Sequence, residues 1–342
     1  RPSGRPHVNP PPTPTPKITA STKPIAILVP GALNPHALKR IEAEFSIVRI
    51  PDGSAAHVTP EMAGKVRGLS AMVTPVTAAL IDALPNLEII ANYGVGYDSV
   101  DAKHAANRDV MVTNTPDVLT EEVADTAMGL LLNTVRELRA AENWLRAGKW
   151  ASEGPLPLTR LTLRGRRAGI FGMGRIGLAI ARRREAAGLT VEYHNRRPAE
   201  GVSYRYHPTL KGLAESVDTL ISVAPGTSST AKAVNAEILA ALGPDGVFVN
   251  IGRGSTVDED ALAKALNDGT IAAAGLDVFA DEPNVSQALL DAPNTSLLPH
   301  VGSASVHTRR AMADLSVDNL VSWFSQGKAI TPVPETAGVK PR

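Results

Sequence analysis

The chain has no cysteine, so disulfides, thiol nucleophiles and cysteine-ligated zinc are excluded from its 342 residues. Aromatic residues make up only 4%, which argues against the stacking surfaces that hold single-stranded nucleic acid. The formal net charge is +1, so no bulk attraction to nucleic acid or membranes is expected. No apolar run reaches the roughly 18 residues of a transmembrane helix, and no signal-peptide pattern is visible. We therefore expect a cytoplasmic protein with no nucleic-acid or membrane partner, and we assign no metal site.

Proline is concentrated at the start of the chain, in "RPSGRPHVNPPPTPTP" (1–16). Proline lacks the backbone N–H that helices and sheet ladders use, so such a segment favours extended chain. We predict a disordered proline-rich tail over residues 1–23.

Short apolar runs alternate with helical patterns in the rest of the chain, which is typical of βαβ units and parallel sheets. The first series of expected strands is "PIAILVPG", "SIVRIP", "LSAMVTP", "LEIIANYG" and "DVMVTNTP". A second series begins at 166 and contains six: "RRAGIFG", "LTVEYHN", "VDTLISVAP", "GVFVNIGRG", "IAAAGLDVF" and "TSLLPHVG". The pattern predicts an α/β protein with two doubly wound parallel-sheet domains, one flavodoxin-like and one Rossmann. Helices over 119–148 and 304–326 are the expected crossovers, with an irregular arm over 150–165.

A glycine-rich turn follows the first strand of the second series. In "GIFGMGRIG", Gly172, Gly174 and Gly177 have the G-x-G-x-x-G spacing between an apolar strand and a helical pattern. The first glycine permits the tight turn, the second permits close approach of a pyrophosphate, and the third permits close helix packing. The free N–H groups of the helix N-terminus suit the phosphates. This turn predicts dinucleotide binding, although a plain structural turn would share the spacing.

The segment "HNRRP" indicates which dinucleotide is bound. A carboxylate that holds the adenosine ribose usually stands about 20 residues after such a turn. Here Asn195 occupies the place, followed by Arg196 and Arg197. A neutral amide does not repel a 2′-phosphate, and guanidinium groups bind phosphate well. We expect NADP(H) to be preferred over NAD(H) by about tenfold to a hundredfold, since one charged hydrogen bond contributes about 1.5–3 kcal/mol.

Three polar side chains follow strands of the second series. Arg253 lies in "NIGRGS", Glu282 in "ADEP" and His300 in "LPHVG". Ligands of such sheets bind at the carboxyl ends of the strands, so we expect the three to gather at one edge.

Together these segments resemble the D-isomer-specific 2-hydroxyacid dehydrogenase family over about 24–326. The resemblance rests on the ordered set "NYGVGYDSVD", "GMGRIG", "VNIGRGSTVD", "GLDVFADEP" and "PHVGS". Within the family, "HNRRP" is most similar to NADPH-dependent glyoxylate/hydroxypyruvate reductases. The resemblance implies a substrate-binding domain over 24–118 plus 305–330 and a dinucleotide-binding domain over 119–304.

The resemblance also implies roles for individual residues. Arg253 would clamp the carboxylate of a 2-oxoacid, and His300 would protonate the developing alkoxide as hydride arrives at C2. Glu282 would hydrogen-bond His300 and favour its protonated form. Val95 and Gly96 would bind the substrate carboxylate through backbone N–H groups. The remaining cofactor contacts would come from Thr126, Arg175, Ile176, Val223, Ala224, Pro225, Ile251, Asp277, Gly302 and Ser303, with His300 also facing the cofactor.

Other readings stay open at this point. An NAD-dependent phosphoglycerate, lactate or formate dehydrogenase of the same family is one, although the two arginines argue against NAD and formate dehydrogenases pair histidine with glutamine. A non-catalytic, NADP-sensing, corepressor-like protein is another. The arm near Trp144 and Trp150 predicts a homodimer, with core or interface packing favoured for these side chains over a place in a neighbouring pocket.

Overall fold

The computed structural model describes residues 24–342, so the prediction for residues 1–23 lies outside the described residues. Two compact units are present. In the described part, the first unit contains residues 24–93, 99–114 and 313–342. The second contains 94–98 and 115–312. The five residues Gly94–Asp98 therefore lie with the second unit, although the expected boundary placed them in the first domain.

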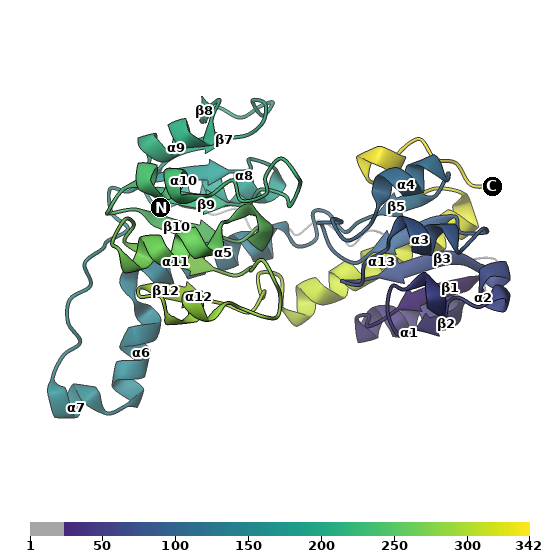
Figure 1. Cartoon of the computed structure of the whole chain (residues 1–342), viewed down its shortest axis with the longest axis horizontal. Helices are drawn as coiled ribbons and strands as arrows, with labels where there is room; N and C mark the ends of the chain where they lie inside the picture. The colour runs from purple at the N-terminus through teal and green to yellow at the C-terminus, as the bar shows by residue number, and fades with distance from the viewer. Residues whose placement is uncertain (1–23) are drawn as a thin grey trace, which may run out of the picture. The chain divides into compact units, whose positions relative to one another are not determined.

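The first unit is built on a five-stranded parallel sheet of order β2-β1-β3-β4-β5 (Figure 1). Nearly every position of its central strands is buried, because helices cover both faces of such a sheet. Leu28, Leu69 and Ile90 are fully buried. The strands are β1 (Ala26–Pro30), β2 (Ser46–Ile50), β3 (Val66–Ala71), β4 (Ile89–Asn92) and β5 (Met111–Thr113). Its helical segments are α1 (Pro35–Glu44), η1 (Ala55–His57), α2 (Pro60–Lys65), α3 (Ala78–Asp82), α4 (Ala102–Asn107) and η3 (Pro334–Thr336), with most of α13 (Val306–Gln326).

The second unit contains a seven-stranded parallel sheet of order β12-β11-β10-β9-β6-β7-β8. The strands are β6 (Arg167–Phe171), β7 (Thr190–His194), β8 (Arg205–His207), β9 (Thr219–Ser222), β10 (Val247–Asn250), β11 (Ala273–Leu276) and β12 (Thr295–Leu297). Its helical segments are α5 (Thr120–Arg136), α6 (Leu138–Arg146), α7 (Lys149–Glu153), α8 (Arg175–Ala186), α9 (Leu210–Ser216), α10 (Ala236–Leu242), η2 (Gly254–Thr256), α11 (Glu259–Asn267) and α12 (Gln287–Asp291). The strand order reverses next to β6, where the doubly wound fold places its ligand.

The two parallel sheets confirm the predicted fold class, with two differences in detail. The three-residue strand β8 was not expected, because it is too short to show a pattern. The predicted continuous helix over 119–148 is wrong. It ends at Arg136, and Glu137 adopts a left-handed conformation with φ 51° before α6 begins. The Asn133 side chain accepts a hydrogen bond from the Arg139 N–H at 2.9 Å, which satisfies a donor freed by the break.

The arm formed by α6 and α7 extends away from the seven-stranded sheet (Figure 1). Neither helix has a buried residue. Several apolar side chains are exposed along it: Leu138, Leu145, Trp150 and, just beyond α7, Leu158. Such a row of exposed apolar groups is typical of a surface that another protein covers.

Helix α8 contains an unusual buried charge. Arg184 is completely buried, and its three guanidinium nitrogens have no hydrogen-bond partner within residues 24–342. Burial lowers the pKa of Arg184 to about 9, because the apolar surroundings disfavour the charged form. The adjacent Arg183 instead forms ion pairs with Glu121 at 2.6 Å and Asp125 at 2.7 Å.

Candidate active site

The glycine-rich turn connects β6 to α8, and its glycines serve different needs. A Cβ atom on Gly172, which has φ 103°, would lie 2.8 Å from the Ala224 nitrogen. A Cβ atom on Gly177 would lie 2.3 Å from the Gly172 carbonyl oxygen. A Cβ atom on Gly174 would meet no atom within 4 Å. Gly172 and Gly177 are thus required by packing, whereas Gly174 leaves open space beside the helix N-terminus, as a bound pyrophosphate requires.

The turn is joined to the end of β7 through Asn195. The Asn195 Oδ1 accepts a hydrogen bond from the Met173 N–H at 2.6 Å, and its Nδ2 donates to the Met173 carbonyl at 3.2 Å. The loop beyond is held by two tyrosines: Tyr206 donates to the Asn195 carbonyl, and Tyr193 accepts from the Ala199 N–H. Arg196 and Arg197 are exposed on this fixed loop. Two guanidinium groups therefore project from a rigid support next to the glycine turn.

Several other predicted cofactor residues lie near this edge of the sheet. Val223 and Ala224 pack against both Gly172 and Gly252, and the Pro225 carbonyl accepts a hydrogen bond from Thr230. Ile251 is buried and its Cδ1 would lie 3.6 Å from a Cβ atom on Gly302. Arg175 and Ile176 lie at the start of α8. Ile176 is partly exposed, and Arg175 forms an ion pair with Asp117 at 2.8 Å.

His300 and Glu282 are in direct contact. The His300 Nδ1 lies 2.6 Å from the Glu282 Oε2, and the Glu282 Oε1 accepts from the Phe279 N–H at 3.0 Å. With both oxygens engaged, the carboxylate has a fixed position. A hydrogen bond at Nδ1 leaves Nε2 of the imidazole available for proton transfer. The His300 side chain is 47% exposed, so it is accessible to a reactant.

The loop that carries His300 is held by a buried carboxylate. Asp277 is 1% exposed, and its two oxygens accept from the Val301 N–H at 2.7 Å and the Gly302 N–H at 2.8 Å. Burial raises the pKa of Asp277, an effect that these two hydrogen bonds oppose. From α5, the Thr126 hydroxyl donates to the Gly302 carbonyl at 3.0 Å. His300 itself has φ 53°, a left-handed conformation that these contacts support.

Further anchors of this loop were not singled out from the sequence. Glu122 accepts hydrogen bonds from Ser305 at 3.0 Å and Thr308 at 2.8 Å. Arg309 donates to the Ser303 carbonyl at 3.2 Å. The two Glu122 contacts join α5 to the start of α13 over more than 180 positions of sequence, and no local motif marks them.

Arg253 contacts a different set of groups. It follows β10, which neighbours β11 in the sheet, and β12 lies beyond β11. Its Nε donates to the Asp98 Oδ1 at 3.1 Å. A Cβ atom on Gly96 would lie 1.7 Å from its Nη2, so the guanidinium lies directly against the backbone of residues 94–98. The structure thus brings Arg253 to the loop that contains Val95 and Gly96, and places Glu282 with His300.

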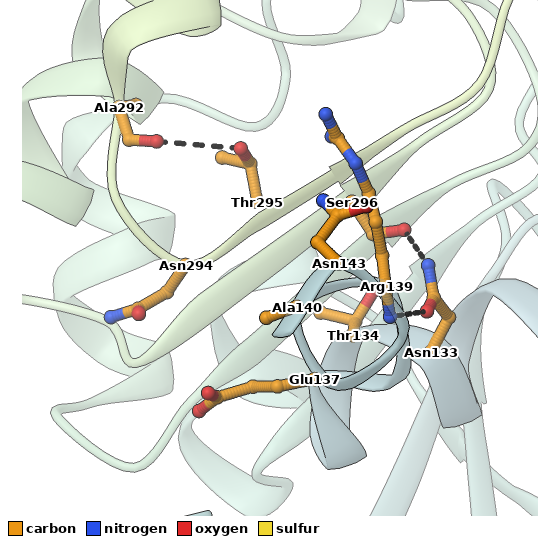
Figure 2. Close-up of a pocket in the computed structure, with 10 residues that line it drawn as sticks. All are labelled: Asn133, Thr134, Glu137, Arg139, Ala140, Asn143, Ala292, Asn294, Thr295 and Ser296. Atoms are coloured by element: carbon orange, nitrogen blue, oxygen red, sulfur yellow. Dashed lines mark hydrogen bonds between the residues drawn. The ribbon is translucent and has the colours of Figure 1, made fainter. Parts of the chain in front are cut away.

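A separate cavity of about 280 Å³ lies where α5 ends, against the start of β12 (Figure 2). Asn133 lines the cavity and donates a hydrogen bond to Ser296 (Figure 2). The lining residues are Asn133, Thr134, Glu137, Arg139, Ala140, Asn143, Ala292, Asn294, Thr295 and Ser296. It contains none of the residues predicted from the sequence, so we do not place the reaction there.

Residues 24–342 show neither a membrane-spanning helix nor a metal-binding cluster. No described helix has the length and apolarity needed to cross a bilayer. Among the same residues, no cluster of three or more histidine or carboxylate side chains is arranged to hold a metal ion.

Comparison with known proteins defines the class. Residues 128–302 match the NAD binding domain of D-isomer specific 2-hydroxyacid dehydrogenases. The chain belongs to this family, as its motifs predicted.

Individual relatives show which members of the family this chain resembles. The chain is 41% identical to glyoxylate/hydroxypyruvate reductase A HPR2 of Arabidopsis thaliana, over 90% of this chain and 99% of that protein. It is 40% identical to 2-ketogluconate reductase of Gluconobacter oxydans, over 92% and 99%. A solved NADPH-dependent glyoxylate/hydroxypyruvate reductase from Sinorhizobium meliloti, in complex with NADP and malonate, is 61% identical. That structure matches with a TM-score of 0.91 over 94% of this chain and 99% of the other.

Proposed function

We propose that the protein reduces small 2-oxoacids, with glyoxylate and hydroxypyruvate as the leading substrates, to D-2-hydroxyacids with NADPH. The observation that carries this proposal is the Glu282–His300 pair, which lies at the same sheet edge as Arg253 and the glycine turn. The 61% identity to an NADPH-dependent glyoxylate/hydroxypyruvate reductase supports the choice of substrate and coenzyme.

The proposed mechanism assigns one task to each group. Residues 119–304 form the coenzyme-binding domain, which also supplies Arg253 and His300, and residues 24–118 plus 305–330 form the substrate-binding domain. NADPH, when bound, supplies a hydride to C2 of the oxoacid. Arg253 and the backbone N–H groups of Val95 and Gly96 hold the substrate carboxylate. His300 donates a proton from Nε2 to the oxygen on C2, while Glu282 holds the ring in place through Nδ1. Asp277 and Thr126 keep the His300 loop in position. Both Asp277 oxygens also retain lone pairs that could accept a hydrogen bond from the carboxamide of the nicotinamide.

The coenzyme preference rests on Asn195, Arg196 and Arg197. A spectrophotometric assay at 340 nm with NADPH or NADH tests it. Glyoxylate, hydroxypyruvate, pyruvate, phosphohydroxypyruvate and 2-ketogluconate form the substrate panel. We expect NADPH to be favoured by about tenfold to a hundredfold in kcat/KM. Equal kcat/KM for both coenzymes would remove the NADP assignment. No turnover of any oxoacid, with NADPH bound, would favour the corepressor-like alternative.

A variant at the loop sharpens the coenzyme test. Arg196→Ala with Arg197→Ala should lower kcat/KM with NADPH by at least about tenfold, because the 2′-phosphate loses its charged partners. Activity with NADH should stay near wild type. Arg164→Ala, which removes another exposed arginine of the second unit, is the matched control.

We also propose a cytoplasmic homodimer. The exposed apolar residues of the α6–α7 arm support a second copy as the partner. Trp144 is engaged within the arm, where its Nε1 donates to the Gly154 carbonyl, whereas Trp150 is 63% exposed. Light scattering tests the assembly, and a single monomeric species would contradict it. Leu145→Glu on the arm should favour the monomer, and fractionation of cells tests the location.

A further inference from the structure

The backbone at Arg253 is held in place by two side chains. The Asn250 Nδ2 donates to the Arg253 carbonyl at 3.0 Å, and the Thr256 hydroxyl donates to the same oxygen at 2.7 Å. Asn250 and Thr256 are completely buried, so neither partner is free to move. The direction in which the Arg253 side chain leaves the backbone is therefore fixed by the end of β10.

The guanidinium group is then held at its other end. Nη1 donates to the Gly252 carbonyl at 3.0 Å, Nε donates to the Asp98 carboxylate at 3.1 Å, and Nη2 lies against Gly96. Asp98 is the one charged group among these contacts and lies 155 positions away in the sequence. A guanidinium has five N–H donors, of which Asp98 takes the one on Nε and the Gly252 carbonyl takes one on Nη1, so the other hydrogens of the terminal nitrogens remain for a ligand.

A long side chain such as arginine loses rotamer entropy when it is fixed, which can weaken a binding equilibrium by up to about thirtyfold. A substrate that had to order a free arginine would lose that amount from its binding. A guanidinium already ordered by Asp98 avoids the loss, which is the benefit of preorganisation. Asp98 is 49% exposed, so the ion pair by itself adds little to the stability of the fold.

We propose that Asp98 is a positioning residue, which orients the Arg253 guanidinium so that its terminal nitrogens face the substrate carboxylate. The inference rests on the role of Arg253 in the proposed function. The alternative is a purely electrostatic role for Asp98, because a carboxylate next to Arg253 also weakens the attraction of the site for an anionic substrate. The two ideas predict opposite changes in KM when the charge is removed.

Three substitutions separate them. Asp98→Ala removes both the hydrogen bond and the charge, and should raise KM for glyoxylate by about tenfold to thirtyfold, because the substrate must then order the arginine side chain. Asp98→Asn keeps an acceptor for Nε without the charge, and should hold KM within about threefold of wild type. Asp98→Glu keeps the charge but moves it by one methylene, and should raise KM like the alanine variant.

Asp101→Asn is the matched control. It makes the same chemical change three positions further on, where Asp101 caps α4 by accepting from the His104 N–H at 3.0 Å. Asparagine is as good an N-cap as aspartate, so KM should not change. NADPH affinity, measured by fluorescence titration, should match wild type in every variant, and it reports whether each one is folded.

The outcomes are distinguishable. A wild-type KM in Asp98→Ala, or a lower KM in Asp98→Ala and Asp98→Asn together, overturns the positioning role. If Asp98→Ala does not fold, Asp98→Glu decides, because a charge effect alone leaves its KM unchanged. Arg253→Gln tests the underlying role separately, since a wild-type KM there refutes the arginine assignment itself. In the Arg253→Gln background, Asp98→Ala should add no further increase.

Discussion

The glycine turn and the His300 loop lie at the same edge of one sheet and are built in opposite ways. The turn depends on the absence of side chains, because a single Cβ atom on Gly172 or Gly177 would strike backbone atoms. The loop depends on side chains, chiefly Asp277 and Thr126, which bind its backbone N–H and carbonyl groups. A surface that must approach a phosphate needs bare backbone, whereas a loop that must aim one imidazole needs anchors. Substitutions in the two regions should therefore fail in different ways.

The largest effect is expected at the imidazole. His300→Ala should lower kcat by about 10²–10⁴-fold, the contribution of a positioned proton donor. NADPH affinity should stay near wild type, since the glycine turn is untouched. Steady-state kinetics and fluorescence titration measure the two quantities. Turnover near the wild-type rate would remove His300 as the donor.

Substitutions in the glycine turn should weaken NADPH binding instead of slowing the chemical step. Gly172→Ala forces a side chain onto a residue with φ 103° and against the Ala224 nitrogen, so NADPH affinity should fall at least about tenfold and thermal stability should drop. Gly129→Ala in α5 is the control, because its Cβ atom would meet no neighbour. That control should stabilise the protein by about 0.5–1 kcal/mol. Wild-type NADPH affinity in Gly172→Ala would show that the turn tolerates side chains.

Helix α8, which follows the turn, offers a stability test. Arg184→Met removes an unpaired buried charge and should raise the free energy of unfolding by about 1–4 kcal/mol at pH 7. The folded state holds the Arg184 proton less tightly than the unfolded state, because its folded pKa is about 9 and lies below its ordinary value. Wild-type stability should therefore rise as the pH increases above about 9, and the advantage of the variant should shrink there.

Denaturant unfolding at pH 7 and pH 10 measures this difference. Arg183→Met is the neighbouring control, since it removes ion pairs with Glu121 and Asp125 and should cost up to about 1 kcal/mol. A destabilised Arg184→Met protein would mean that the guanidinium has an important partner.

The smallest effect is expected at one anchor of the His300 loop. Thr126→Val keeps the shape of the side chain but removes the hydroxyl that donates to the Gly302 carbonyl. One neutral hydrogen bond contributes about 0.5–1.5 kcal/mol, so kcat should fall by about threefold to tenfold. Thr126→Ser keeps the hydroxyl and should restore most of the rate. Equal rates in both variants would exclude the hydroxyl as an anchor.

The sequence predicted what depends on local pattern. Most buried strands lie in apolar runs, and the glycine spacing located the turn between β6 and α8. The break at Glu137 escaped prediction, since no glycine or proline marks it and one of its supports, Ser296, is 163 positions from Asn133. The Asp98–Arg253 contact and the anchors on Glu122 escaped for the same reason. They are side-chain contacts between elements that only the fold brings together.

The double hydrogen bond of Asn195 with Met173 limits how this enzyme could be redesigned for another coenzyme. An aspartate there would bind a ribose diol, yet it has no N–H to give to the Met173 carbonyl. The exchange would therefore trade a structural clamp for a ligand contact, and would loosen the turn that the new ligand needs. A protein engineer seeking an NADH-dependent version would have to supply a replacement donor for that carbonyl, in addition to removing the two arginines.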